Sequence, residues 1–514
     1  MVLSFGTGGV RAIMGPGPDR LNSNTMQLLC QGLANYIHKN KTKPTPKVAI
    51  AYDSRKNSAL FAKLCARVLA ANGIEALLFS KPRPTPLLSF ACIYHHCQAG
   101  IVISASHNPP EYNGFKVYWD DGAQVVFPHD VGIMQEMEIN SDVKIVDLKH
   151  PLIKKIPPSF DEIYLNILRT LQNYPDQNKK EGKSLKIIYS SLHGVGITLV
   201  PAALKELGFS SVNLVKKQCE MNGSFPHAKI PNPEEQEALL LGAEALLKKK
   251  ADILLVNDPD ADRIGVVIRH KNKAISFSGN QIAAICLYHL LKAGRHVQDN
   301  TVFVKTIVTT ELFKEIAAHF NHECFDVLTG FKYIAAKIPH LEKNDQYRFL
   351  FGAEESCGYL QSTFVRDKDG VQAAFLISEI ALSLKKEKKT LYDQLLFLYK
   401  EFGLFREKLS TLSLPKEKIH RMMQLFRQNP PRSLLGKKVI KIEDFADGLD
   451  DFPSSDVLRF WLEDQTKVVI RPSGTEPKIK IYVGAVKKKF SSLPKAMKEM
   501  DNYLDKLIES ICNV

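Results

Sequence analysis

The stretch D-I-L-L-V-N-D-P-D-A-D-R-I-G, from Asp252 to Gly265, carries the clearest structural signal in this chain. Its residues Ile253 to Val256 form a short, branched, apolar run bounded by Pro259, which is typical of a buried β-strand. Three aspartates at alternate positions follow this run: Asp258, Asp260 and Asp262. Loops that leave such strands face the crevice where α/β sheets hold ligands. The stretch therefore predicts an α/β fold with a carboxylate cluster at a ligand-binding edge.

Three carboxylates on one loop suit a hard cation. Mg²⁺ in particular prefers oxygen ligands and completes its shell with water or substrate phosphate. An EF-hand is excluded, because its loop needs Gly at the sixth position and Glu at the twelfth. Counting from Asp258, those places hold Arg263 and Arg269. An acidic, solvated loop is the plain alternative, and Arg263 beside the trio favours instead a site that also meets a phosphate.

Length and composition set the broad class. At about 150 residues a domain, 514 residues predict three or four domains, and 45% hydrophobic residues can fill several cores. We expect no membrane association, since no apolar stretch approaches the roughly 20 residues of a membrane span. The start, Met1 to Gly9, shows no secretion signal. Nine scattered cysteines without a C-x-x-C pair indicate reduced thiols, so we expect a cytoplasmic protein.

The net charge of +14 raises the question of nucleic acid. The lysines are dispersed, and their short runs lack aromatic stacking partners nearby. We interpret them as solvated faces: Lys248–Lys250, Lys385–Lys389 and Lys487–Lys489. We therefore expect no nucleic-acid partner, and a positive field that attracts small anionic substrates.

The order of expected elements indicates repeated strand–loop–helix units with mixed or parallel sheets. The expected strands cover residues 48–52, 74–79, 100–104, 115–118, 185–190, 253–256, 264–268, 302–308, 347–351, 467–470 and 478–483. Helices are expected at 58–72 and 493–511, with Gly73 at the C-cap of the first. The polar stretch 172–184 reads as a linker, and the Pro-, Arg- and Ser-rich stretch 429–435 as a last boundary.

The segment S-A-S-H-N-P, Ser104–Pro109, directly follows an apolar strand, which places Ser106 on an exposed turn. A serine hydroxyl is a poor nucleophile, but a phosphoserine is a good phosphoryl donor when a metal neutralises its charge. Taken alone, the segment is only a turn with a serine. Beside the aspartate loop it becomes a predicted phosphoryl donor that faces a metal.

Three further loops carry chemistry. R-P-S-G-T-E-P, Arg471–Pro477, joins two strands and offers an arginine fork, two hydroxyls and a glycine whose neighbours can form an anion nest. G-A-E-E-S-C-G, Gly352–Gly358, suits vicinal sugar hydroxyls, although a helix N-terminus also favours Glu and Ser. F-G-T-G-G-V-R, Phe5–Arg11, lacks both G-x-G-x-x-G and the Walker lysine, so it predicts neither a dinucleotide nor an NTP site.

Together these segments resemble the α-D-phosphohexomutase family, and more narrowly its phosphoglucomutase/phosphopentomutase branch. The matching motifs span nearly the whole chain in order. They are F-G-T-G-G-V-R, M-G-P-G-P-D-R-L-N (Met14–Asn22), S-A-S-H-N-P-P-E-Y-N-G-F-K-V-Y, N-D-P-D-A-D-R, T-G-F-K (Thr329–Lys332), G-A-E-E-S and R-P-S-G-T-E-P-K.

The resemblance implies four domains around a central cleft: three similar α/β domains with mixed sheets and a C-terminal α+β domain like the TATA-binding protein. We expect a phosphoserine domain at 1–178, a metal-binding domain at 183–298, a sugar-binding domain at 299–405 and a phosphate-binding domain at 406–514.

The resemblance also implies residue roles. Ser106 would be phosphorylated and would hold Mg²⁺ together with Asp258, Asp260 and Asp262. It would pass its phosphoryl group to a sugar monophosphate, with a bisphosphate intermediate and a glucose 1,6-bisphosphate primer. The other catalytic candidates, for proton transfer and charge stabilisation, are Arg11, His107, Lys116 and Arg263. The resemblance favours Lys116 or Arg11 as the base, and a lysine base needs a depressed pKa.

Substrate contacts follow from the same resemblance. The expected sugar-binding residues are Glu354, Ser356, Gly330 and Lys332, and the expected phosphate-binding residues are Arg471, Ser473, Gly474, Thr475 and Lys368. The chain departs from the family at Gly8, where relatives usually have Ala or Ser. It also has Cys357 in the sugar loop, which puts substrate preference in question.

Several functions remain open from the sequence. The first is interconversion of glucose 1-phosphate and glucose 6-phosphate or the corresponding pentose phosphates; phosphomannomutase and phosphoglucosamine mutase are neighbouring alternatives. A catalytically silent sugar-phosphate-binding protein belongs to another class, and the retained Ser106 and Arg471 speak against it. An aspartyl-phosphate phosphatase with Asp258 as nucleophile leaves the Ser106 segment unexplained. The expected partners are sugar phosphates, and the protein is expected as a monomer or a homo-oligomer.

Overall fold

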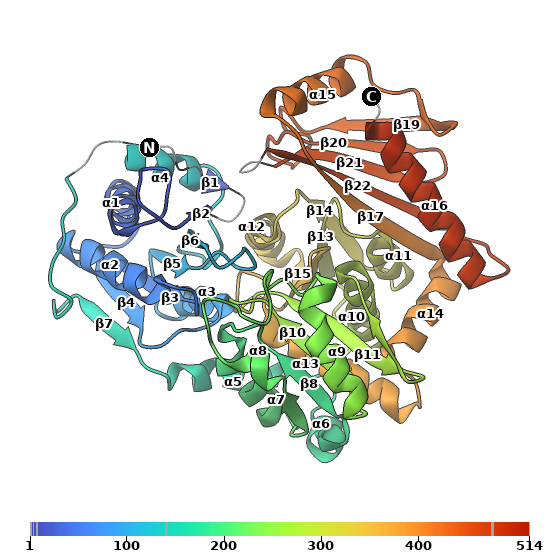
Figure 1. Ribbon diagram of the computed structural model, residues 1–514, viewed down its shortest axis with the longest axis horizontal. Coiled ribbons are helices and arrows are strands. Elements are labelled where there is room, and N and C mark those ends of the chain that lie inside the picture. The colour runs from blue at the N-terminus through green and yellow to red at the C-terminus, as the bar shows by residue number, and fades with distance from the viewer. Residues whose placement is uncertain (1–2, 4, 7–8, 139–141, 474–476, 513–514) are drawn as a thin grey trace.

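The computed structural model describes the chain except for residues 1–2, 4, 7–8, 139–141, 474–476 and 513–514. Four β-sheets follow one another in chain order and form an arc from the N-terminal to the C-terminal unit (Figure 1). The first three sheets mix parallel and antiparallel strands, and the fourth is antiparallel throughout. This arrangement confirms the predicted fold class of three α/β units and a C-terminal α+β unit.

The first unit is a seven-stranded sheet in the order β1-β2-β6-β5-β3-β4-β7. Its strands are β1 (Phe5–Gly6), β2 (Gly9–Ile13), β3 (Lys47–Tyr52), β4 (Glu75–Phe79), β5 (Ala99–Ile103), β6 (Tyr112–Trp119) and β7 (Ile153–Ile156). Its helices are α1 (Ser23–Asn40), α2 (Ser58–Ala71), α3 (Thr85–Tyr94) and α4 (His129–Glu138). The edge strand β7 pairs in parallel with β4. It was not among the predicted strands, because it lies in a charged segment with two adjacent lysines.

The second unit is a five-stranded sheet in the order β12-β11-β10-β8-β9. Its strands are β8 (Ile187–Ser190), β9 (Val212–Leu214), β10 (Ile253–Asn257), β11 (Ile264–His270) and β12 (Lys273–Ser276). The helices of this part of the chain are α5 (Phe160–Thr170), α6 (Pro175–Glu181), η1 (Gly182–Ser184), η2 (Val195–Thr198), α7 (Val200–Glu206), α8 (Lys216–Cys219) and α9 (Gln236–Lys248). The strand β10 is central and fully buried, as its apolar run predicts.

The third unit is a four-stranded sheet in the order β14-β13-β15-β16. Its strands are β13 (Thr301–Thr306), β14 (Glu323–Val327), β15 (Arg348–Glu354) and β16 (Gly358–Gln361). The helices around it are α10 (Gly279–Ala293), α11 (Glu311–His319), α12 (Phe331–Glu342), η3 (Lys343–Asp345), α13 (Gly370–Lys386) and α14 (Leu391–Phe402). The helix α13 also packs against β10 and β11, so it joins the second and third units.

The fourth unit is a six-stranded antiparallel sheet in the order β17-β22-β21-β20-β19-β18. Its strands are β17 (Leu404–Ser413), β18 (Ser433–Leu434), β19 (Lys437–Asp444), β20 (Leu458–Leu462), β21 (Lys467–Pro472) and β22 (Lys478–Lys487). Its helices are α15 (Lys416–Gln428) and α16 (Leu493–Cys512), and α16 packs on β17 and β22. The predicted boundary at 429–435 lies inside this unit, between α15 and β19.

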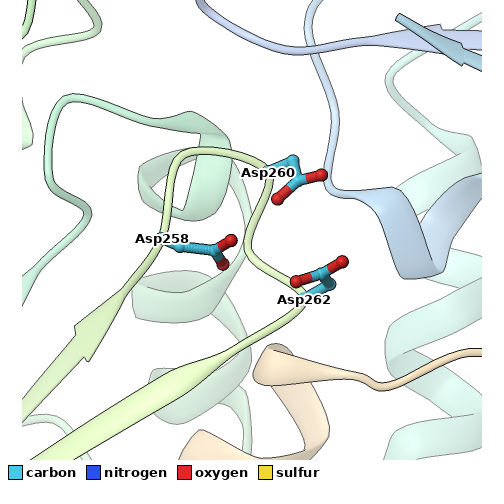
Figure 2. A group of neighbouring side chains, drawn as sticks. All are labelled: Asp258, Asp260 and Asp262. Atoms are coloured by element: carbon cyan, nitrogen blue, oxygen red, sulfur yellow. The ribbon is translucent and has the colours of Figure 1, made fainter. Parts of the chain in front are cut away.

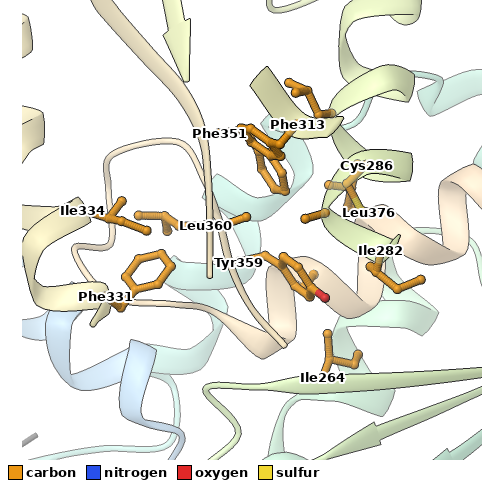
Figure 3. Close-up of a cluster of buried hydrophobic side chains, with 14 of the residues drawn as sticks. Ile264, Ile282, Cys286, Phe313, Phe331, Ile334, Phe351, Tyr359, Leu360 and Leu376 are labelled. Atoms are coloured by element: carbon orange, nitrogen blue, oxygen red, sulfur yellow. The ribbon is translucent and has the colours of Figure 1, made fainter. Parts of the chain in front are cut away.

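A continuous apolar core passes through the units. Figure 3 shows its part around β15 and β16, where Phe351 and Tyr359 stack with ring centroids 6.4 Å apart. Ile264 of the second sheet and Ile282 of α10 belong to the same buried cluster. Each fully buried side chain of this size contributes about 1.5–3 kcal/mol. This packing fixes the positions of the strands whose ends carry the loops.

The predicted linker at 172–184 is wrong, because this polar stretch folds into α6 and η1. The reason lies in a distant residue, Glu379 of α13, whose carboxylate is fully buried. Glu379 accepts hydrogen bonds from the backbone N–H groups of Asn173 and Tyr174 and from the side-chain amides of Asn173 and Asn178, at 2.6–3.1 Å. Polar residues that look solvated in sequence are thus anchored by one long-range carboxylate.

Two further observations bear on the environment of the chain. In the structure all nine cysteines are free thiols, and seven of them are buried. Among the described residues, no helix combines the length and apolarity needed to cross a membrane.

We predict that Glu379→Ala lowers the free energy of unfolding by about 3 kcal/mol, since it orphans several buried N–H donors at once. Thermal unfolding followed by calorimetry would give this as a clear fall in Tm. Glu387→Ala, at the exposed C-terminal end of the same helix, is the matched control and should change stability by no more than about 0.5 kcal/mol. Equal Tm values for the two variants would contradict the anchoring role.

Candidate active site

A cavity of about 550 Å³ opens where loops of all four units meet. Its lining includes residues of all four units: Arg11, His107, Lys116, Arg263, Glu354, Ser356, Lys368, Arg471, Ser473 and Lys480. Most of the site residues predicted from the sequence therefore share one space, although they come from distant parts of the chain.

The aspartate loop connects β10 and β11 at one side of this cavity. Asp258, Asp260 and Asp262 are buried, and one oxygen of each lies within 4.8 Å of the others. Figure 2 shows the three carboxylates gathered around one point at the loop. Gly194 makes the tight packing of this loop possible, because a Cβ there would lie 2.2 Å from the Cα of Pro259.

Two lysines from other units neutralise the aspartates. Lys116 Nζ of β6 lies 2.6 Å from Asp260 Oδ2 and 3.4 Å from Asp262 Oδ2. Lys368 Nζ, from the loop before α13, lies 2.9 Å from Asp262 Oδ2. Burial opposes ionisation of Asp260, but Lys116 outweighs it and lowers the pKa of this carboxyl. Burial and the two neighbouring carboxylates raise the pKa of Asp258.

The donor set fits a divalent cation. Asp260 Oδ1 and Asp262 Oδ1 are buried and have no hydrogen-bond partner within the described part of the chain. Unsatisfied buried oxygens are costly, and three converging carboxylates are the ligands that Mg²⁺ takes. The residues present are therefore compatible with a Mg²⁺ site formed by Asp258, Asp260 and Asp262.

The serine loop leaves β5 and reaches this cluster. Ser106 has a left-handed backbone with φ of 52°, and its Oγ donates to Asp258 Oδ2 at 2.7 Å. His107 Nδ1 lies 3.2 Å from the same Oγ. Burial, together with Arg263 and Arg11, holds the pKa of His107 well below its usual value, so its imidazole is neutral. The hydroxyl predicted as the phosphoryl acceptor and donor thus lies directly at the aspartate cluster.

The two arginines predicted as catalytic candidates flank the loop. Arg11 of β2 donates from Nη1 to Asn108 Oδ1 at 3.2 Å. Burial lowers the pKa of Arg11, with a smaller contribution from Arg263, against the opposing effect of the aspartates. Arg263 places Nη1 3.3 Å from Glu234 Oε2, and its backbone N–H donates to Asp258 Oδ1 at 3.0 Å. Burial opposes its charge, but Glu234 and Glu354 raise the pKa of Arg263.

The predicted sugar loop ends β15. Glu354 and Ser356 line the cavity, as does Gly330 at the start of α12 with φ of 122°. Lys332 is not among the lining residues, and its Nζ lies 3.4 Å from Asp130 Oδ2 of α4. Cys357 is buried with φ of 60° and is not among the lining residues either.

Glu355, between the two predicted sugar ligands, also lines the cavity. Its Oε2 accepts a hydrogen bond from Thr306 Oγ1 at 3.4 Å. Burial, and then the neighbouring Glu354 carboxylate, raise the pKa of Glu355 to about 7.

The predicted phosphate loop approaches from the fourth sheet. Arg471 of β21 and Ser473 line the cavity, whereas Gly474 and Thr475 lie outside the described residues. Lys368, which we expected to bind phosphate, lines the cavity but also pairs with Asp262 and with Asp367 at 3.3 Å.

Sequence reasoning missed four residues that shape the site: Arg55, Thr85, Glu234 and Lys480. Thr85 Oγ1 donates to Asp260 Oδ2 at 3.0 Å, and Arg55 holds the serine loop from behind. Lys480 and Tyr482 of β22 line the cavity two residues apart, on one face of the strand. Only Lys480 had a usable sequence signal, because the alternation K-I-K-I-Y of a strand beside the R-P-S-G-T turn puts it on that face.

Three family models match the chain: phosphoglucomutase/phosphomannomutase α/β/α domain I at residues 2–144, domain II at 162–271 and domain III at 278–401. Together they cover more than half of it. A phosphoglucomutase of Staphylococcus aureus (strain MRSA252) is 38% identical over 502 residues, covering 94% of this chain and 89% of the relative. One of Staphylococcus haemolyticus is 37% identical over 503 residues, covering 94% and 90%.

Solved structures share the fold. The open form of parafusin, a phosphoglucomutase from Paramecium, superposes with a TM-score of 0.78 at 18% identity, covering 99% of this chain and 94% of that one. A phosphomannomutase structure from Thermus thermophilus gives 0.75 at 20% identity, covering 100% and 99%. N-acetylphosphoglucosamine mutase of Aspergillus fumigatus, in complex with GlcNAc-6P and magnesium, gives 0.51 at 12% identity, covering 99% and 95%.

We predict that Asp260→Asn weakens Mg²⁺ binding at least about tenfold. Replacing a residue that only supports a metal ligand lowers metal affinity about 10–100-fold, and we expect loss of a ligand itself to cost at least as much. Isothermal titration with MgCl₂ measures this directly. Asp252→Asn, on the same segment but at the other end of β10 and paired with Lys385, is the control and should bind Mg²⁺ as the wild type does. Unchanged binding by Asp260→Asn would place the metal elsewhere.

The raised pKa of Glu355 predicts a pH-dependent stability. The unfolded carboxyl ionises near 4.5 and the folded one near 7, so the unfolded state loses its proton first and stability falls as pH rises through this window. Glu355→Gln should therefore flatten the plot of Tm against pH between about 4.5 and 7. The exposed Glu323→Gln should keep the wild-type slope, and an equal slope in all three proteins would refute the assignment.

Proposed function

Since this chain belongs to the phosphoglucomutase/phosphomannomutase family of α-D-phosphohexomutases, we propose that Ser106 carries the phosphoryl group that the enzyme transfers. Phosphoglucomutase-type phosphoryl transfer, the chemistry of an intramolecular phosphotransferase, is the activity of this family branch and of this chain. The relatives named phosphoglucomutase, together with the presence of Ser106, the three aspartates and Arg471, favour this activity over a silent sugar-phosphate-binding protein and over an aspartyl-phosphate phosphatase.

One observation carries the proposal: Ser106 Oγ lies 2.7 Å from Asp258 Oδ2, at a buried carboxylate cluster in which Asp260 Oδ1 and Asp262 Oδ1 have no hydrogen-bond partner among the described residues. A phosphoryl group on this hydroxyl would lie among oxygen ligands and the ammonium groups of Lys116 and Lys368. Mg²⁺ bound by Asp258, Asp260 and Asp262 would neutralise negative charge on the transferred group.

The proposed cycle has two transfers of the same kind. A hydroxyl of the sugar monophosphate attacks the phosphorus of phospho-Ser106, so a new P–O bond forms and the serine P–O bond breaks. A base takes the sugar hydroxyl proton, and the leaving Ser106 oxygen takes up one proton to become a hydroxyl. The resulting bisphosphate turns over in the cavity. The Ser106 hydroxyl then gives its proton to the base and attacks the other phosphorus of the bisphosphate. The P–O bond between this phosphorus and the sugar breaks and the sugar oxygen takes up a proton, which regenerates phosphoserine and releases the isomeric monophosphate. Glucose 1,6-bisphosphate would act as the primer.

The general base is proposed among the side chains around Ser106. The neutral His107 lies 3.2 Å from the hydroxyl and can accept a proton. Lys116 is held by Asp260 and Asp262 through its ammonium group, and Arg11 contacts the serine loop at Asn108. We retain Lys116 and Arg11 as the candidates of first choice, with His107 and Arg263 as the groups that neutralise charge or relay the proton.

Substrate recognition is proposed at two further parts of the cavity. Glu354 and Ser356 would accept and donate hydrogen bonds to the sugar hydroxyls, with Gly330 at the same wall. Arg471, Ser473, Gly474 and Thr475 would hold the phosphate that does not react, and the cavity-lining Lys480 adds positive charge to this end. Lys332 joins the sugar site only if its ion pair with Asp130 opens.

We propose glucose 1-phosphate and glucose 6-phosphate, or the corresponding pentose phosphates, as the substrates, in the cytoplasm and with Mg²⁺ as cofactor. The magnesium of the Aspergillus relative and the glucose 1,6-bisphosphate complex of the same enzyme (TM-score 0.50) support the cofactor and the primer. Relative kcat/KM values would separate this substrate choice from mannose and glucosamine phosphates.

We predict that Ser106→Ala abolishes turnover of glucose 1-phosphate, measured in a coupled assay with Mg²⁺ and a trace of glucose 1,6-bisphosphate, while its Tm stays close to that of the wild type. Intact mass should show one added phosphate on the wild type, mapped to Ser106, and none on the variant. Ser80→Ala, an exposed serine of the same unit, should keep both the phosphate and the activity. Full activity of Ser106→Ala would overturn the proposed mechanism.

A further inference from the structure

Arg55, in the loop after β3, makes an unusual set of contacts behind the serine loop. Its side chain is fully buried, and its guanidinium donates to backbone carbonyls. These acceptors are the carbonyls of Ser106 at 2.6 Å, Asn108, Pro109 at 2.8 Å and Tyr112 at 3.0 Å. One side chain therefore binds four carbonyl oxygens of the segment that carries the phosphoryl group.

Arg55 is itself fixed from two sides. Its Nε lies 3.3 Å from Asp53 Oδ2, and Asp53 Oδ1 accepts from the Arg55 backbone N–H at 2.9 Å and from Ser58 Oγ at 2.7 Å. On the other side, the guanidinium carbon lies 4.8 Å from the ring centroid of Phe225, which belongs to the second unit. The planar, rigid fork of an arginine suits this stacked, multi-acceptor position.

The neighbouring segments bring the second unit close to Arg55. Gly223 allows this approach, because a Cβ there would lie 2.4 Å from the backbone N of Lys56. Ser54 Oγ donates to the His193 carbonyl at 2.8 Å, next to Gly194, which packs on the aspartate loop. Arg55 therefore lies at the joint between the unit that carries Ser106 and the unit that carries the aspartates.

The serine loop needs such support. Ser106 has a φ of 52°, a conformation that costs a non-glycine residue free energy and persists only when its surroundings hold it. The hydroxyl must also lie within hydrogen-bond reach of Asp258 across a boundary between units. Phosphoryl transfer depends on positions held to within a fraction of an ångström.

We propose that Arg55 is a positioning residue for phosphoryl transfer: it fixes the carbonyls of the serine loop so that the Ser106 hydroxyl faces the aspartate cluster. The guanidinium of Arg55 is buried behind the serine loop and donates to the carbonyls of this loop, so it acts through Ser106. The inference rests on the proposed function of Ser106 and adds to it the residue that sets its geometry.

Arg55→Lys tests this role, because one ammonium keeps the charge but cannot serve four carbonyls in a planar array. We expect kcat to fall about 100-fold with KM unchanged. The rate at which Ser106 gains phosphate from glucose 1,6-bisphosphate, followed by intact mass in a single turnover, should fall by the same factor. A purely structural arginine would lower Tm without changing kcat per folded molecule.

Arg83→Lys is the matched control, since Arg83 is also buried and also pairs with an aspartate: its Nε lies 2.9 Å from Asp161 Oδ1 of α5. It should keep kcat and the phosphorylation rate. If Arg55→Lys fails to fold, Asp53→Asn decides the matter, because it removes the charge that holds Arg55 in place but keeps the side-chain shape. A lower kcat with unchanged KM in that variant supports the proposal.

Two results would overturn the inference and are distinguishable. Wild-type values of kcat and of the phosphorylation rate in Arg55→Lys would refute the positioning role, as would the same values in Asp53→Asn if Arg55→Lys does not fold. Phosphate on Ser106 of the wild type would then still support the proposed function. A wild type that never acquires phosphate on Ser106 would refute both together.

Discussion

The burial of three carboxylates within 4.8 Å of one another is the constraint on which the rest of the structure depends. Each desolvated charge costs several kcal/mol unless cations compensate it. Arg263 of the loop itself pairs with Glu234, and the two ammonium groups that contact the carboxylates come from other units: Lys116 from the first sheet and Lys368 from the third unit. The aspartate loop is therefore stable only when three units meet around it. The Ser106 hydroxyl of the first unit also contacts this cluster, at Asp258. The charged contacts that join the units therefore lie at the same place as the proposed chemistry.

The loops around this cluster share a second feature. Ser106, Ala261 and Cys357, one on each of the serine, aspartate and sugar loops, have φ values of 52°, 56° and 60°. Each such residue costs about 1–3 kcal/mol, which the surroundings must supply. Contacts from other segments do so: the Cys357 carbonyl accepts from the Ile264 backbone N–H, and the Ala261 carbonyl accepts from that of Gly370. The shared apolar core beneath β11, β15 and β16 holds these strands in fixed relation (Figure 3).

The sequence predicted what is encoded locally. The apolar run before Asp258 predicted β10, the alternation of aspartates predicted the cluster, and the apolar run before Ser104 predicted the serine turn. The predicted exposure of this turn is wrong: Ser106 is 1% exposed, because its loop is packed between Arg55 and the aspartate cluster. Contacts made across the chain had no local signal. Glu379 turns an apparent linker into α6, and Thr85 and Arg55 reach the site from segments that read as an ordinary helix start and loop. Lys332 matched the sugar motif, but a partner on α4 holds its ammonium group. Residue type and order identify a loop, whereas the direction of a long side chain depends on neighbours that only folding supplies.

The distribution of positive charge in the cavity explains how one site could serve two orientations of a ligand. Lys116, Lys368 and Arg263 gather near the aspartates, whereas Arg471 and Lys480 approach from the fourth sheet. A sugar with a phosphate at each end meets cations at both, and it meets similar charges after it turns over. Charge alone then cannot distinguish the two poses or one sugar phosphate from another. We therefore expect discrimination among sugars to come from other groups, and our candidates are Glu354 and Ser356, which line the cavity from the third unit. Cys357 is buried with a φ of 60° and is not among the lining residues, so we expect its identity to affect the sugar through the backbone turn that follows Glu354 and Ser356.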